Sequence, residues 1–94
     1  MTKKQKQRRY RYFGIWYGPN DIEELVELMD ENGCLTPFET WLNTVIDPYE
    51  LWKAIKTYGE ESITKDLTED YREDMIDAIA AGVYDHLFED IEVL

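Results

Sequence analysis

The chain has 94 residues, of which 44% are hydrophobic and 14% aromatic, and its formal net charge is −11. This length fits one domain, and the many large side chains exclude a disordered acidic segment. The charge is divided along the chain. Residues 1–13 contain six Lys and Arg and no acid, whereas residues 14–94 contain 21 acids against four Lys and Arg, a charge of −17. A body this acidic repels nucleic acid and anionic membranes, and it attracts basic surfaces.

Cysteine usage and hydropathy indicate where the protein works. The single cysteine, Cys34, cannot form an internal disulfide, and no apolar run approaches the length of a membrane span. No secretory signal peptide is recognisable at the start of the chain. We therefore expect a cytoplasmic protein without membrane contacts.

The first part of the chain predicts a tail and a strand. We expect residues 1–8 to form a basic flexible tail and residues 9–94 a single acidic helical domain. Residues 9–17 are dense in β-favouring aromatic side chains, which predicts a strand. Because an unpaired strand is a liability, it must pair with residues 61–65, with residues 91–94, or with a second chain in a homodimer.

Four helices complete a mainly α fold with a small β component (α+β): residues 21–32, 37–46, 48–58 and 68–91. Apolar residues in each recur at the spacing of one helix face. Gly33 predicts the end of the first helix. Thr36 and Glu39 predict a capping box for the second, and Asp47 predicts the cap of the third. Residues 60–66 fit either a loop or a short strand.

The last predicted helix carries a dense acidic face. At 100° per residue, six acids fall within about 140° of arc: Asp66, Glu69, Asp70, Glu73, Asp74 and Asp77. They span about 18 Å, or about one charge per 3 Å, close to the one charge per about 3.4 Å of a single DNA strand. Acids of the first helix extend this surface: Glu23, Glu24, Glu27, Asp30 and Glu31.

Two interpretations of this face compete. Most acidic helix faces are only solvated, and this one fits that description. However, only Lys65 and Arg72 lie nearby in sequence, and like charges at helical spacing repel one another. Such repulsion suggests that the face has a use.

Two aromatic residues project close to the acids. Tyr84 and Phe88 lie near the azimuth of Glu73 and Asp77 on the same projection. Aromatic side chains on a charged face are typical of interface anchors. The alternative is that another helix or a second subunit covers both of them.

No residue pattern predicts catalysis or metal binding. His86 is the single histidine, Cys34 has no histidine near it in sequence, and no set of cysteines and histidines has zinc-site spacing. The acids around Gly33 do not continue as a calcium-binding loop. We therefore expect a non-enzymatic protein without a metal or cofactor.

The basic segment from Lys3 to Arg11 allows three interpretations. It is a solubilising arm, it grips nucleic acid with help from Tyr10 and Tyr12, or it folds back on an acidic body. That body belongs either to the same chain or to a second copy. Apart from this segment, we expect no contact with nucleic acid.

The run from Asp66-Leu67-Thr68-Glu69-Asp70 to Tyr84-Asp85, followed by Leu87-Phe88-Glu89-Asp90, combines acids and aromatics on one predicted helix. In composition and patterning it resembles the small acidic DNA mimics that phages and mobile elements use against restriction and other defence systems. The basic tail departs from that family. The resemblance implies an inhibitor that occupies the DNA-binding cleft of a basic protein, such as a nuclease, a restriction or CRISPR-type effector, or a polymerase. For a phage protein, the compartment is the host cytoplasm.

The alternative function is an adaptor- or antitoxin-like module. It would bind a partner protein through its exposed aromatics, Tyr84 and Phe88, and its acidity would serve solubility alone.

Overall fold

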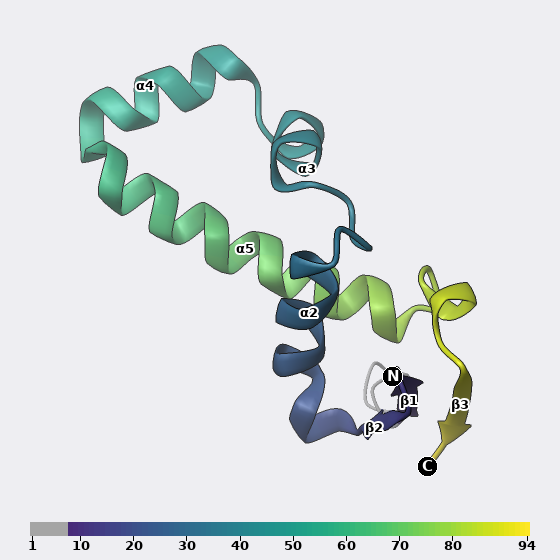
Figure 1. Ribbon diagram of the computed structural model, residues 1–94. Helices are drawn as coiled ribbons and strands as arrows, with labels where there is room; N and C mark the ends of the chain where they lie inside the picture. The colour runs from purple at the N-terminus through teal and green to yellow at the C-terminus, as the bar shows by residue number, and fades with distance from the viewer. Residues whose placement is uncertain (1–7) are drawn as a thin grey trace.

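The computed structural model describes residues 8–94 (Figure 1). Lys3, Lys4 and Lys6 of the predicted tail lie outside the described residues. The elements in chain order are β1 (Arg8–Tyr12), β2 (Ile15–Tyr17), η1 (Pro19–Asp21), α2 (Ile22–Glu31), α3 (Phe38–Val45), α4 (Pro48–Tyr58), α5 (Glu60–Ala80), η2 (Asp85–Leu87) and β3 (Asp90–Val93). The predicted fold class, mainly α with a small β component, is confirmed. No helix in the described part of the chain is long and apolar enough to cross a membrane.

The small sheet has β1 at its centre, in the order β2-β1-β3. Both neighbours pair antiparallel to it, so that Tyr10 lies opposite both Tyr17 and Ile91. The predicted single strand 9–17 is a hairpin, because Phe13 and Gly14 take positive φ values of 50° and 77° and reverse the chain. Of the three pairings considered for this segment, the one with the C-terminal residues is correct.

The predicted bounds of the last helix are wrong at both ends. The helix begins at Glu60, so residues 60–66 are neither loop nor strand. It ends at Ala80 because Gly82 takes a φ of +90°. The Gly82 and Val83 N–H groups then donate to the carbonyls of Ile79 and Ala78 at 3.1 and 3.0 Å, which is a Schellman motif.

The other helices agree closely with the predicted bounds, although one cap differs. Gly33 ends α2 at φ +70°, and the Asp47 carboxylate caps α4 by accepting from the Tyr49 N–H at 2.7 Å. The predicted capping box of α3 is wrong, because α3 has no side-chain cap. The Thr36 hydroxyl instead lies 3.0 Å from the Tyr84 hydroxyl.

The core lies at one end of an elongated molecule. Its buried residues are Tyr10, Tyr12, Tyr17, Leu25, Val26, Met29, Leu35, Trp41, Tyr71, Met75, Ile79 and Tyr84. None of residues 46–70 is buried, so α4 and the first half of α5 form an arm that leaves the core (Figure 1). The radius of gyration is 15.2 Å, against about 12 Å for a compact chain of this length.

Candidate functional site: two acidic surfaces on the long helix

All the acids predicted to contact a partner are exposed. Helix α2 crosses the second half of α5, and α5 carries most of these acids (Figure 1). The acids of α5 line two grooves, one shared with α2 and the other with α3, and Glu73 lines both. Five of the predicted acids line neither groove: Glu24, Glu27, Asp30, Glu31 and Asp66.

The groove between α2 and α5 is bordered by four acids, which we call the acidic band: Glu23, Glu69, Glu73 and Asp77. It consists of two adjoining hollows, which share Glu23, Glu73 and Ile76. Arg72 is the one cation among the residues that line these hollows, and it forms an ion pair with Glu27 at 3.7 Å. The band therefore joins two helices that are distant in sequence into one negative surface.

The groove on the other side of α5, called the α3–α5 groove, is partly apolar. Its lining residues are Trp41, Val45, Ile46, Leu67, Asp70, Glu73 and Asp74. The Trp41 indole N–H donates to the Asp74 carboxylate at 2.7 Å. Asp74 therefore holds α3 against α5 and is not merely a solvated charge.

Asp30 has a structural contact of the same kind. The Tyr71 hydroxyl lies 3.3 Å from the Asp30 carboxylate and 2.6 Å from the Thr36 carbonyl, to which it donates the shorter bond. Burial, followed by the nearby Asp30 charge, raises the pKa of Tyr71 to about 12. The hydroxyl therefore remains a neutral donor that ties α5 to the loop between α2 and α3.

Replacing Tyr71 with Phe should destabilise the fold by about 1–3 kcal/mol, because the Thr36 carbonyl loses its donor in a partly buried position. Urea denaturation measures this change. The raised pKa also means that stability is complete below the ordinary value of about 10 and is lost as pH rises through about 12. The Phe variant should lose less stability than the wild type over that interval, and equal alkaline losses would contradict the assignment.

The two aromatics predicted on the acidic face lie elsewhere. Tyr84 is only 8% exposed, and its hydroxyl oxygen accepts from the Thr36 N–H at 3.1 Å. Phe88 is half-buried, with its ring centroid 4.7 Å from that of Tyr10. Because α5 ends at Ala80, both residues leave the helical projection on which the prediction relied. Both residues contact the same chain, Tyr84 through Thr36 of the loop between α2 and α3 and Phe88 through Tyr10 of β1, and not a second subunit or another helix as the alternative expected.

The described part of the basic segment folds back on its own chain. Arg8 pairs with Asp85 at 2.9 Å, Arg11 with Glu89 at 3.4 Å, and Arg9 with Glu92. Arg8 also donates to the Ala80 carbonyl at 3.3 Å, where a cation is favourable at the C-terminal end of α5. These pairs balance the charge around the sheet and leave the excess of acid on the helices.

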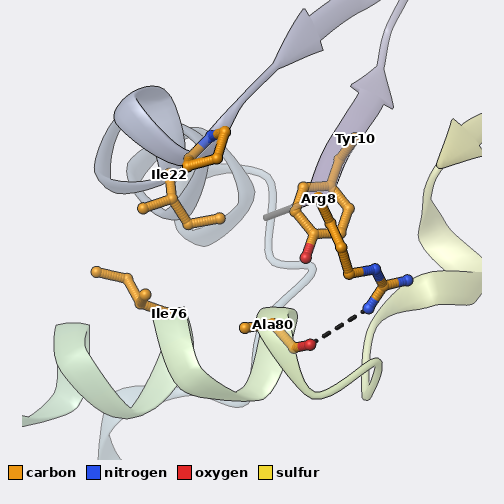
Figure 2. A pocket seen from close by; sticks show the side chains of 6 residues that line it. Arg8, Tyr10, Ile22, Ile76 and Ala80 are labelled. Atoms are coloured by element: carbon orange, nitrogen blue, oxygen red, sulfur yellow. Dashed lines mark hydrogen bonds between the residues drawn. The ribbon is translucent and has the colours of Figure 1, made fainter. Parts of the chain in front are cut away.

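A small cavity lies beneath Arg8, where β1 and η1 meet α5 (Figure 2). Its lining residues are Arg8, Tyr10, Pro19, Ile22, Ile76 and Ala80. The volume is about 50 Å³, far below the roughly 300–1,000 Å³ of small-molecule sites. The Arg8 guanidinium is already held by Ala80 and Asp85, so this cavity is a packing junction.

The side chains considered as catalytic or metal-binding residues do not lie close together in the described part of the chain. Cys34 lies 3.4 Å from the Tyr12 hydroxyl, whose pKa is raised, mainly by burial. His86 is exposed in η2. Among residues 8–94, no three His, Cys, Asp or Glu side chains are placed to share a metal ion.

One exposed surface was missed by sequence reasoning. Tyr49, Trp52 and Tyr58 on α4 are 62%, 53% and 69% exposed. Their spacing predicts a helix with an apolar face but does not show whether anything covers that face. These residues are the large aromatic surface that the arm presents.

Comparison with known proteins found no relative of the chain. No family model matches the chain, and no curated protein or solved structure shows significant similarity to it. Function must therefore be argued from the geometry above.

Proposed function

We propose that this protein is a non-enzymatic inhibitor that mimics the charge of DNA. It occupies the basic DNA-binding cleft of a defence or DNA-processing protein, such as a nuclease, a restriction or CRISPR-type effector, or a polymerase. The observation that carries the proposal is the acidic band, in which Glu23 of α2 and Glu69, Glu73 and Asp77 of α5 border one groove.

The arrangement of the band supports a likeness to a duplex. Glu69, Glu73 and Asp77 recur every four residues, about 6 Å apart along the axis of α5. On α2, Glu23 borders the same groove, and Glu27 lies four residues further along the helix, where it pairs with Arg72. Negative charge on both sides of a hollow resembles the two phosphate strands that border a groove of DNA.

The electrostatic cost of the band argues against a role in solubility alone. Like charges four residues apart on a helix destabilise it by about 0.2–0.5 kcal/mol per pair, and α5 contains several such pairs. Surfaces that serve only solubility mix charges of both signs. The bases of β1 are paired with the C-terminal acids and do not offset the band.

Inhibition follows from competition for one cleft. The negative band steers the protein toward a positive cleft and speeds association. Once bound, its carboxylates pair with the Lys and Arg that otherwise contact phosphates. No covalent step is needed.

Capture from host-cell lysate tests this proposal with two variants of equal charge. The band variant is Glu23→Gln/Glu69→Gln/Glu73→Gln, and the control is Glu39→Gln/Glu50→Gln/Glu60→Gln, which changes exposed acids on α3, α4 and the start of α5. The wild type and the control should retain the same DNA-binding proteins, eluted by free duplex DNA, and the band variant should lose them. Equal retention on both variants would contradict a role for the band.

The alternative function, an adaptor-like module, was predicted to bind its partner through two exposed aromatic residues. Tyr84 is buried, and Phe88 is half-buried against Tyr10, so neither is the exposed anchor that this alternative predicts. An aromatic contact would instead have to use the rings of α4.

A further inference from the structure

Helix α4 carries rings and cations on one stripe of its surface, called the α4 stripe: Tyr49, Trp52, Lys53 and Lys56. The rings of Tyr49 and Trp52 stack with centroids 6.0 Å apart. The Lys53 ammonium lies 5.4 Å from the centroid of Tyr49, and the Lys56 ammonium lies 4.6 Å from that of Trp52. The stripe thus presents a positive, aromatic surface on a chain of net charge −11.

The arm that carries this stripe is held by few buried side chains. None of residues 46–70 is buried, and helices of this length are marginal in water without tertiary packing. Tyr49 and Trp52 leave most of their surface in water, at 62% and 53% exposure. A surface that covers the stripe would stabilise the arm.

The same chain offers a surface of matching chemistry in the α3–α5 groove. Its apolar walls come from Trp41, Val45, Ile46 and Leu67, and its rim includes Asp70 and Asp74. Its volume is about 380 Å³, and it is open to solvent along the surface. Apolar walls suit the rings of the stripe, and the carboxylates suit its two ammonium groups.

We propose that a second copy of this chain fills the groove. The α4 stripe of each copy docks into the α3–α5 groove of the other, so a two-fold axis produces the contact twice. Lys53 and Lys56 meet the acids of the partner copy, which lowers the repulsion between two acidic chains. Glu23, Glu69 and Asp77 of the acidic band line only the groove shared with α2 and remain open in this dimer, whereas Glu73 borders both grooves.

Nucleic acid fits the α4 stripe less well than a second copy of the chain does. Glu50, Glu60 and Glu61 lie close in sequence to the two lysines, and the net charge of the chain repels phosphate. The dimer is tested apart from the proposed inhibition, because its variants at Trp52, Lys53, Lys56 and Asp70 change no residue of the acidic band. Failure of either proposal leaves the other standing.

Sedimentation equilibrium of the full chain over a concentration series tests the dimer. The wild type should approach twice its mass of 11.2 kDa. Trp52→Ala should weaken the dimer by about 30-fold, the effect of removing an interface anchor. Phe13→Ala removes a ring that is 73% exposed at the hairpin turn, and it should leave the dimer unchanged. Circular dichroism confirms that each variant is folded.

Charge reversal tests the stated pairing. Lys53→Glu/Lys56→Glu should abolish the dimer, and adding Asp70→Lys should restore part of it. A wild type that stays monomeric at every concentration would overturn the proposal. A dimer that Trp52→Ala leaves intact, or that Phe13→Ala disrupts, would overturn it as well.

Discussion

Replacing Ile79 with Ala should destabilise the protein by about 2–5 kcal/mol, the cost of removing a large apolar side chain from a core. Ile79 is 0% exposed and lies among the buried residues of the second half of α5. That half carries Glu73 and Asp77, so its attachment to the core sets the position of the acidic band. Because a domain of this size has only about 5–15 kcal/mol of stability, the loss is a large fraction of the total.

Urea denaturation followed by circular dichroism measures this effect. Val83→Ala is the control, because Val83 lies just beyond the same helix and is 58% exposed. The control should change stability by less than about 0.5 kcal/mol. Equal losses in the two variants would contradict the placement of Ile79 at the centre of the core.

The sequence predicted the bounds of α2 and α4 well because the end of the first and the start of the second have a local chemical cause. Asp47 accepts a hydrogen bond at the start of α4, and Gly33 has the positive φ that ends α2. These signals depend on a few neighbouring residues, so they are readable without the fold.

The last helix was extended too far because its apolar spacing continues past its true end. Gly82 fits either a weak point in a helix or the residue that terminates one, and its positive φ shows the second. Tyr84 and Phe88 were placed with the acids only as a consequence of that extension. A hydrophobic period cannot distinguish a helix from the turn and strand that follow it when the same core attracts both.

The exposure of the acids was predictable, but their grouping was not. Charged residues opposite an apolar helix face remain in water whatever the fold. Which acids share a groove depends on how α2 and α3 cross α5, and that is tertiary information. Asp30 and Asp74 illustrate the difference, because both hydrogen-bond to buried aromatic side chains and therefore also serve the fold.

The two kinds of charge in the sequence have separate places in the fold. The described arginines of the basic segment are balanced at the sheet by Asp85, Glu89 and Glu92. The acidic band lies on the helices, where Arg72 already has an acidic partner. The basic segment therefore closes the sheet and does not neutralise the surface proposed to act.

The salt dependence of binding to a captured DNA-binding protein tests the central claim most directly. Between about 0.01 M and about 0.15 M salt the screening length falls from about 30 Å to about 8 Å. Steered electrostatic association contributes about 10- to 1,000-fold at low salt, so the affinity of the wild type should fall by a factor in that range. The Glu39→Gln/Glu50→Gln/Glu60→Gln control should show the same steep slope, and the Glu23→Gln/Glu69→Gln/Glu73→Gln band variant a shallow one. An affinity that does not change with salt, or equal slopes for the two variants, would contradict mimicry of DNA by the acidic band.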